Sequence, residues 1–127
     1  MVVLDTNIII DHLRQPKTKN SRLIKIAKQR PKETLAISMI SIQELYEGRS
    51  TRNEEKEQFL LAIIAPLKIL PYDYEAAKLA GQIARDLGRP IELADAAIAA
   101  STMLNGAQLV TLNKKDFQGI KELELVG

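Results

Sequence analysis

The sequence predicts an α/β fold, a three-layer α/β/α sandwich with a mainly parallel central sheet. Short apolar runs typical of buried strands alternate with longer segments whose apolar residues recur every three or four positions, as in amphipathic helices. Helices of about ten residues between strands imply right-handed crossovers, so the strands should be parallel and helices should cover both faces. A chain of 127 residues fits one domain, spanning residues 1–127.

Each expected element has a start or stop signal in the sequence. Along the first half of the chain we expect a strand at 2–4, helices at about 6–14 and 21–30, a strand at 35–38, a helix that carries Glu44 and ends at Gly48, and a helix from 51 or 53 to about 65. Along the second half we expect a strand at 68–70, helices at 73–87 and 93–104, and strands at 109–111 and 123–126. Prolines at 16, 31 and 66 and glycines at 88 and 106 separate these elements.

Composition excludes several classes of function. The chain has no cysteine, so disulfides, thiolate zinc sites and cysteine nucleophiles are excluded, and a cytoplasmic location is expected. The longest apolar stretch, residues 59–67, is well short of the roughly 18 residues that a membrane span needs, and no basic leader precedes Asp5 and Asp11. We therefore expect no membrane association. His12 is the only histidine, which rules out a two-histidine ribonuclease mechanism and favours a surface role for this residue.

Each of four acidic residues lies where an apolar segment ends or a helix begins: Asp5, Glu44, Asp95 and Asp116. In an open parallel sheet, ligands bind outside the carboxyl ends of the strands, and all four side chains should reach that edge. Carboxylates beside an apolar core are unfavourable unless something compensates their charge. A divalent cation that prefers oxygen ligands, Mg²⁺ or Mn²⁺, is the simplest shared compensator.

Each acid also has a purely structural interpretation. Asp5 could cap a helix, and Asp95 could interact only with a helix dipole. The spacing of Ser41 and Glu44 fits a capping box, in which Ser41 caps the helix and Glu44 is its partner. Asp116 could stabilise a turn. The coincidence of all four acids at one expected edge favours a common site.

A basic segment follows the first acid. Between His12 and Lys32 the chain has eight basic residues and no acid, although the formal net charge of the whole chain is only +2. Such a segment beside a metal site suits a polyanionic substrate, whereas a solvated helix face is the structural alternative. The residues expected to contact phosphates are Arg14, Lys17, Lys19, Arg22, Lys114 and Lys115.

The four acids lie in four motifs that follow one another in a fixed order. The motifs are Asp5-Thr6-Asn7, the stretch from Ser38 through Ser41 to Glu44-Leu45 with Gly48 behind it, Asp95-Ala96-Ala97-Ile98-Ala99-Ala100, and Thr111-x-Asn113-x-x-Asp116-Phe117. In this order, and in a chain of this length, they resemble the motifs of the PIN-domain nucleases, in particular the VapC-type toxins of toxin–antitoxin pairs. The resemblance covers nearly the whole chain.

The resemblance implies a metal-dependent endoribonuclease that hydrolyses RNA phosphodiester bonds as the toxin of a VapBC-type pair. The catalytic acids and ligands of Mg²⁺ or Mn²⁺ would then be Asp5, Glu44, Asp95 and Asp116. The side chains implied to orient these acids or to contact the substrate are Thr6, Asn7, Ser41, Thr111 and Asn113.

The resemblance also implies a cognate antitoxin and a homodimer. Apolar residues of the helices at 21–30 and 53–65 could form the antitoxin groove or serve only in the core, and the helix at 73–87 could pair two copies. Two other functions stay open: a PIN nuclease that processes RNA or cuts structured DNA, and a catalytically silent module that binds nucleic acid or protein. A thermal stability that changes neither on addition of Mg²⁺ nor in the Asp5→Ala variant would favour the silent module.

Overall fold

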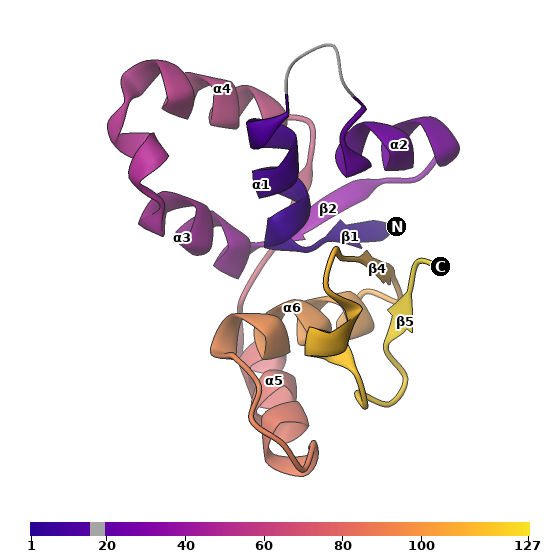
Figure 1. The fold of residues 1–127 in the computed structure, drawn as a ribbon. Helices are drawn as coiled ribbons and strands as arrows, with labels where there is room; N and C mark the ends of the chain where they lie inside the picture. The colour runs from indigo at the N-terminus through magenta and orange to yellow at the C-terminus, as the bar shows by residue number, and fades with distance from the viewer. Residues whose placement is uncertain (16–19) are drawn as a thin grey trace.

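The computed structural model describes residues 1–15 and 20–127 and contains a five-stranded central sheet (Figure 1). Every strand pairs in parallel with its neighbours, in the order β3-β2-β1-β4-β5. The strands are β1 Val2–Leu4, β2 Leu35–Ser38, β3 Lys68–Leu70, β4 Gln108–Val110 and β5 Glu124–Leu125. The parallel sheet that the alternating pattern predicts is confirmed.

Helices cover both faces of this sheet, which confirms the predicted three-layer α/β/α architecture. Their bounds are α1 Thr6–Arg14, α2 Arg22–Gln29, α3 Met39–Glu47, α4 Glu54–Ile64, α5 Tyr74–Asp86 and α6 Leu93–Leu104, with 3₁₀ turns η1 Arg49–Arg52 and η2 Lys114–Phe117. In Figure 1, α1, α2 and α4 lie above the sheet, and α5 and α6 lie below it. Within the described ranges, no helix has the length and apolar character that crossing a bilayer requires.

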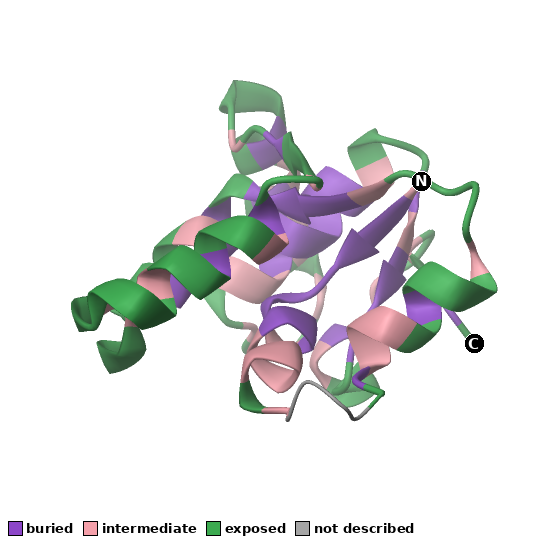
Figure 2. Cartoon of the chain, turned by 90° about the horizontal axis from the view of Figure 1, so that it is seen from above, coloured by how far each residue is buried: buried purple, intermediate pink, exposed green. Residues whose placement is uncertain are grey.

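Alternating side chains on β1 divide the core into two halves. Val2 and Leu4 belong to the hydrophobic cluster that α1, α2 and α4 cover, whereas Val3 belongs to the cluster that α6 covers. All three side chains are fully buried, and the central strands β1, β2 and β4 are mostly buried, as Figure 2 shows. Since both faces of the sheet are covered, β1 is apolar at every position and not only at alternate ones.

The alanine-rich helix α6 packs closely against both the sheet and α5. Ala97 and Ala100 have no exposed surface, and Ala80 of α5 lies in the same cluster as Ala96 and Ala100. Small side chains let the two helix backbones approach each other. This packing holds α6, with Asp95 on its first turn, close to β2 and β4.

The predicted capping box at the start of α3 is wrong. Ser38, and not Ser41, caps this helix, because the Ser38 Oγ accepts a hydrogen bond from the Ile40 N–H at 3.2 Å. Ser41 lies inside the helix and is fully buried. Glu44 is therefore not the partner of Ser41 in a capping box.

Other element bounds differ little from the prediction. β4 ends at Val110, so Thr111, which was expected inside the strand, lies just beyond it. Asn53 caps α4, with its Oδ1 accepting from the Lys56 N–H at 3.0 Å. The turns η1 and η2 are additional elements, and their four-residue length gives the sequence no periodic pattern.

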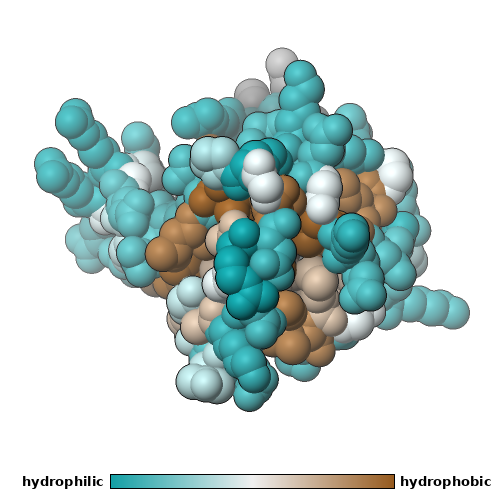
Figure 3. All heavy atoms as spheres, turned by 90° about the horizontal axis from the view of Figure 1, so that it is seen from below, coloured by the Kyte–Doolittle hydropathy of each residue, from teal (hydrophilic) through white to brown (hydrophobic). Residues whose placement is uncertain are grey.

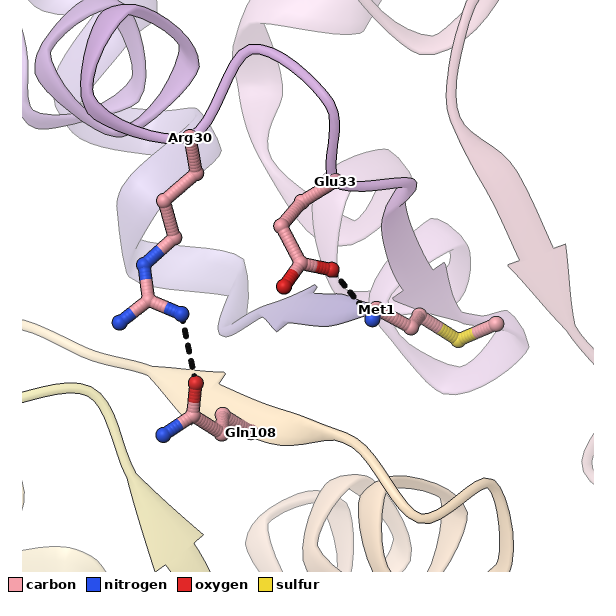
Figure 4. A network of polar contacts seen from close by, with 4 residues as sticks. All are labelled: Met1, Arg30, Glu33 and Gln108. Atoms are coloured by element: carbon pink, nitrogen blue, oxygen red, sulfur yellow. Dashed lines mark hydrogen bonds and ion pairs between the residues drawn. The ribbon is translucent and has the colours of Figure 1, made fainter.

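Polar contacts close the amino edge of the sheet. The Met1 ammonium group forms an ion pair with Glu33 at 2.5 Å, and the Arg30 guanidinium donates to Gln108 Oε1 at 2.6 Å (Figure 4). Gln108 is the first residue of β4, so Arg30 ties the end of α2 to the amino end of that strand. The last part of the basic segment therefore lies at the edge opposite the carboxyl ends.

We expect Ala100→Leu to destabilise the protein by about 1–3 kcal/mol, because the added methylene groups have no room between α5 and α6. Urea denaturation measures this change as the free energy of unfolding. Ala27→Leu, at an exposed position of α2, is the matched control and should stay within about 0.5 kcal/mol of the wild type. Equal stability of the two variants would contradict close packing of α6.

Candidate active site at the carboxyl edge of the sheet

The candidate site lies where the strand order of the sheet reverses, between β1 and β4. Leu4 pairs with Val110, and the Asp5 N–H donates to the Val110 carbonyl oxygen at 3.0 Å. The residues that follow the two strands, Asp5 and Thr111, therefore leave the sheet beside each other. Such a switch point in an open α/β sheet is where ligands bind.

Asp5 is the most buried of the four acids, with 5% of its surface exposed. Its Oδ2 accepts from Thr111 Oγ1 at 2.7 Å, and its Oδ1 accepts from the Thr6 N–H at 2.8 Å, which makes Asp5 the N-cap of α1. Burial raises the pKa of the Asp5 carboxyl group above its usual value; the two hydrogen bonds lower the pKa, and the charges of Glu44 and Asp116 raise it further. The capping role expected for Asp5 is real, but it involves only one of the two oxygens.

The Thr6 hydroxyl group connects Glu44 with Ser41. Thr6 Oγ1 lies 2.5 Å from Glu44 Oε1 and 2.8 Å from Ser41 Oγ. A hydroxyl group has one proton and a carboxylate only accepts, so the Thr6 proton goes to Glu44 and the Ser41 hydroxyl supplies the other bond. The Glu44 carboxylate is thereby held toward the first turn of α1, next to Asp5.

The segment after β4 brings Asp116 to the same edge. Thr111 Oγ1 accepts from the Asn113 N–H at 3.0 Å while it donates to Asp5, and this bond starts the turn into η2. Asn113 Nδ2 donates to Asp116 Oδ2 at 3.0 Å. Asn7 joins from α1, because its Nδ2 donates to Thr111 Oγ1 at 3.4 Å and its Oδ1 accepts a backbone N–H of the same segment at 3.2 Å.

Asp95 lies on the first turn of α6 and is affected by the charges of the other acids. Burial, together with the charges of Asp5, Asp116, Glu44 and Glu92, raises its pKa to about 7. The raised pKa of Asp95 therefore reflects first its burial and then the negative charges around it. Four separate elements thus bring the predicted acids into one electrostatic environment.

The donor chemistry of the four acids fits a hard divalent cation, although they do not form a closed cage. All four side chains offer carboxylate oxygens, the ligands that Mg²⁺ and Mn²⁺ prefer. Among residues 1–15 and 20–127, no three acidic, histidine or cysteine side chains are close enough together to hold an ion by themselves. Mg²⁺ commonly uses one or two carboxylates and keeps several waters, so a sparse set of donors suits it. The assignment of these acids as metal ligands stays a prediction.

A depression beside Asp95 and Asp116 contains two charged residues that belong to no motif, Arg89 and Glu92. Its other lining residues are Pro90, Ile91 and Leu93. Glu92 comes directly before α6, and its position as a helix-terminal acid was visible in the sequence. The Arg89 guanidinium donates to main-chain carbonyl groups of the η2 region, and no sequence pattern signals such a contact.

Two parts of the predicted phosphate-binding set lie near the acids. Arg14 and Glu44 line the same groove on one side of the site. Lys114 and Lys115 are exposed on η2, the turn that carries Asp116, on the other side. Cations therefore flank the acidic group from two directions.

The rest of the basic segment is arranged differently from the prediction. Lys17 and Lys19 lie outside the described residues. Arg22 is half-buried at the start of α2, where its N–H donates to Asp11 Oδ2 at 3.1 Å. Because Arg30 contacts Gln108 at the amino edge, the expectation of one basic face beside the acids does not hold at that end of the segment.

His12 is half-buried between the helices above the sheet, where it makes structural contacts. Its ring stacks on Phe59 of α4 with the ring centroids 6.3 Å apart, and its Nδ1 lies 2.7 Å from Ser21 Oγ. These contacts join α1 to both α2 and α4. A single histidine in a basic segment does not reveal the aromatic partner that partly buries it.

A groove of about 400 Å³ lies between α1, α3 and α4, and Glu44 is one of its lining residues. Its basic lining residues are Arg14, Arg49 and Lys56. The sequence predicted a groove formed by α2 and α4, and Phe59 and Leu60 of α4 do line it. In the part of the chain that the structure describes, α2 contributes no lining residue, and its Ile26 lies in the core, so α2 follows the core-packing alternative.

The sequence and the fold are both similar to those of known proteins. The family model for the PIN domain matches residues 2–123. Ribonuclease VapC10 of Mycobacterium tuberculosis is 32% identical over 127 residues, which cover 98% of this chain and 91% of the relative. The similarity therefore includes every segment that carries one of the four acids.

Two solved structures extend the similarity to the fold. DNA-bound VapBC from Salmonella typhimurium matches with a TM-score of 0.84 at 28% identity, over 98% of this chain and 96% of that chain. VapBC2 from Rickettsia felis, bound to a DNA fragment from its promoter, matches with a TM-score of 0.81 at 29% identity, over 98% of this chain and 96% of that chain.

We expect the metal-free protein to lose stability as the pH rises from about 4 to about 7. In this range the folded state keeps a proton on Asp95 that the unfolded chain releases, so raising the pH favours unfolding. Asp95→Asn should therefore unfold at a higher temperature than the wild type at neutral pH and depend less on pH. Thermal unfolding followed by circular dichroism in EDTA measures both effects.

Asp86→Asn is the control for this prediction. Asp86 is exposed and paired only with Arg85, and this pairing lowers the pKa of its carboxyl group. Its substitution should leave the pH dependence of the wild type essentially unchanged. Parallel pH curves for the wild type and Asp95→Asn would contradict the raised pKa of Asp95.

Proposed function

The chain belongs to the PIN-domain family, and on this basis we propose that it is a metal-dependent endoribonuclease, the toxin of a VapBC-type toxin–antitoxin pair. The observation that carries the proposal is the convergence of Asp5, Glu44, Asp95 and Asp116 at the switch point of the sheet, with a raised pKa at Asp95. The relative that is 32% identical is named a ribonuclease, which supports RNA as the substrate.

The four acids would hold Mg²⁺ or Mn²⁺. Such a cation, when bound, lowers the pKa of water and screens the charge of the phosphate, so that a phosphodiester can be hydrolysed at neutral pH. The chain itself orients the carboxylates: Thr6, Thr111 and Asn113 each donate a side-chain hydrogen bond to one acid, at 2.5, 2.7 and 3.0 Å. A carboxylate has about four lone-pair positions, so each acid keeps free positions for a ligand.

RNA would approach across the cations on both sides of the acids. Arg14, Arg49 and Lys56 line the same groove as Glu44, and Lys114 and Lys115 are exposed on η2. The sequence adds Lys17, Lys19 and Arg22 to these candidates. Because only 4% of the residues are aromatic, base stacking contributes little, and recognition would depend on the backbone and shape of the RNA. Such a substrate implies a cytoplasmic location.

A cognate antitoxin would bind in the groove between α1, α3 and α4. The similar solved structures are complexes named VapBC, which supports a partner of this kind. Phe59 offers the groove an apolar side chain that is 39% exposed, and Glu44 is one of the groove's lining residues. A partner segment seated there would cover one of the acids and block the site.

We also propose a homodimer that forms through α5 and α6. Tyr74 at the start of α5 is 76% exposed, and Leu93 and Leu104, eleven residues apart and hence on one side of α6, are 68% and 50% exposed. Seen from below, hydrophobic surface gathers on both sides of a central column of hydrophilic atoms (Figure 3). Exposed apolar surface of this kind is typical of interfaces, and light scattering in solution tests the pairing.

The two other functions have less support. A PIN nuclease of RNA processing would use the same acids, but similarity to a VapC protein over 98% of this chain favours the toxin. A short neighbouring gene for a DNA-binding antitoxin would separate these two cases. A catalytically silent module has no use for acids that raise one another's pKa, because this repulsion only destabilises the fold.

We expect the purified protein to cleave a labelled pool of structured RNA with Mg²⁺ or Mn²⁺ and to be inactive in EDTA. Asp5→Ala and Asp95→Asn should each lower the cleavage rate by more than the roughly 10–100-fold loss typical of residues that only support a ligand. Asp86→Ala, at an exposed acid of α5, is the control and should cleave at the wild-type rate.

Either of two results would contradict this assignment. A folded wild type that cleaves no RNA with metal would favour the silent module or a different substrate. Cleavage that survives in both Asp5→Ala and Asp95→Asn would place the chemistry elsewhere in the chain.

We expect the exposed lysines of η2 to contribute to RNA affinity through phosphate contacts. Binding is measured at several salt concentrations in the Asp95→Asn background. Replacing Lys114 and Lys115 with glutamine should lower the slope of log affinity against log salt by about 1.4, at about 0.7 per phosphate contact on a single strand. Replacing Lys17, Lys19 and Arg22 with glutamine and measuring the same slope tests whether the basic segment also contacts RNA phosphates.

The control for these variants is the replacement of Lys28 and Lys32 with glutamine. Both are exposed at or beyond the end of α2, toward the amino edge of the sheet. Their loss should leave the slope unchanged. An unchanged slope for the η2 variant as well would reject phosphate contacts on that side of the site.

A further inference from the structure

The side chain of Arg89 joins the segments that carry Asp95 and Asp116. Arg89 lies in the connection between α5 and α6, six residues before Asp95. Its Nη2 donates to the carbonyl oxygen of Gln118 at 2.7 Å and to that of Asp116 at 3.1 Å, and the Lys115 carbonyl oxygen lies at 3.5 Å. Its guanidinium group therefore bridges the entrance of α6 and the turn η2.

The contacts match the chemistry of a 3₁₀ turn. The last carbonyl groups of a helical turn have no partner inside it, and a cation there is favourable. Nη2 carries two protons, so its two shorter contacts, to Gln118 and Asp116, are full hydrogen bonds. Nη1 donates to the Pro90 carbonyl oxygen at 3.1 Å, which fixes the guanidinium plane against its own backbone.

Few other contacts hold the turn η2 in place. Within residues 1–15 and 20–127, every hydrogen bond that reaches residues 114–118 from outside residues 113–120 comes from Arg89. Lys114 and Lys115 are exposed, and Phe117 is the one buried side chain of the turn. Without Arg89 the turn would stay attached through Phe117 and Asn113 would still donate to Asp116, but the hydrogen bonds that hold the turn against the entrance of α6 would be lost.

The positive charge of Arg89 is directed at carbonyl groups and not at the acids. The side-chain ion pair found within the described ranges is Arg85–Asp86, so Arg89 forms none with Asp95 or Asp116, although all three line one depression. An arginine paired with those carboxylates would compete with a cation for them. Arg89 leaves both acids available and contributes only to their placement.

We propose that Arg89 is a positioning residue, which holds η2 against the entrance of α6 and thereby sets Asp116 at the distance from Asp95 that divalent-cation binding requires. This inference rests on the proposed function, in which these two acids serve one cation. Arg89→Lys keeps the charge but lacks the planar fork that reaches two carbonyl groups at once, so lysine should restore only part of the effect.

The test is the Mn²⁺ affinity of the full chain, measured by isothermal titration calorimetry. Arg89→Met should weaken Mn²⁺ binding by about 10–100-fold, the usual effect of losing a residue that supports a ligand. In the Asp116→Asn background, Arg89→Met should cause no further loss, because a ligand that is gone no longer needs positioning. Arg85→Met, the same change at an exposed arginine of α5, should bind Mn²⁺ as the wild type does.

Wild-type affinity in Arg89→Met would overturn the inference, and so would a full additional loss in the double variant, since a purely structural defect adds to any other. Thermal unfolding checks that each variant folds; if Arg89→Met does not, Arg89→Lys and Arg89→Gln carry the same test.

RNA cleavage by the wild type in the same buffer separates the two proposals. Non-additive Mn²⁺ binding without cleavage would sustain the role of Arg89 and reject the nuclease. Cleavage together with unchanged Mn²⁺ affinity in Arg89→Met would sustain the nuclease and reject the role of Arg89. A folded wild type that binds no Mn²⁺ would reject both.

Discussion

The parallel pairing of β1 with β4 is the constraint on which the candidate site depends. Leu4 opposite Val110 places Asp5 and Thr111 side by side, and the hydrogen bond between their side chains follows from that register. A slip of one residue would turn the apolar side chains of β1 to the wrong faces, so burial on both sides of the sheet fixes the register. Packing of apolar residues in the core thus determines the geometry of polar residues at its edge.

The site places negative charges together at a cost to the stability of the fold. Burial and mutual repulsion raise the pKa of both Asp5 and Asp95, so the folded state carries unfavourable electrostatic energy at neutral pH. Neighbouring hydroxyl and amide groups offset part of it, as Thr111 does for Asp5. The remainder favours the binding of a cation, and a fold that removed this repulsion would gain stability and lose affinity for a metal.

The sequence predicted the elements of the sheet well because their signals are local. The bounds of β1, β2, β3 and α6 agree with the expectation, since apolar runs and terminal glycines or prolines define them. The choice between Ser38 and Ser41 as the cap of α3 could not be made in this way. It depends on the partner of Ser41, which is Thr6, 35 residues earlier in the chain.

The four acids could be selected from the sequence because each belongs to a motif, whereas Arg89 could not. An arginine after a glycine at the end of a helix has no distinguishing pattern, and its partners lie 26 to 29 residues further along. The stacking of His12 on Phe59 and the η2 turn escaped prediction for the same reason, because they arise only when distant segments meet. That the acids bind metal is still a prediction from the motifs and the electrostatics.

The order of the strands in the sheet has a consequence for how the protein is made. Its central pair joins two segments that lie far apart in the chain and are synthesised at different times, since Val2 pairs with Gln108. A growing chain that has reached only α5 carries Asp5 and Glu44 but lacks Asp95, Thr111 and Asp116. Its first strand has no β4 to pair with, so the acidic cluster cannot assemble on the ribosome before β4 and η2 have emerged. For the proposed nuclease, hydrolytic activity therefore requires that β4 and the turn η2 have been synthesised and have joined β1.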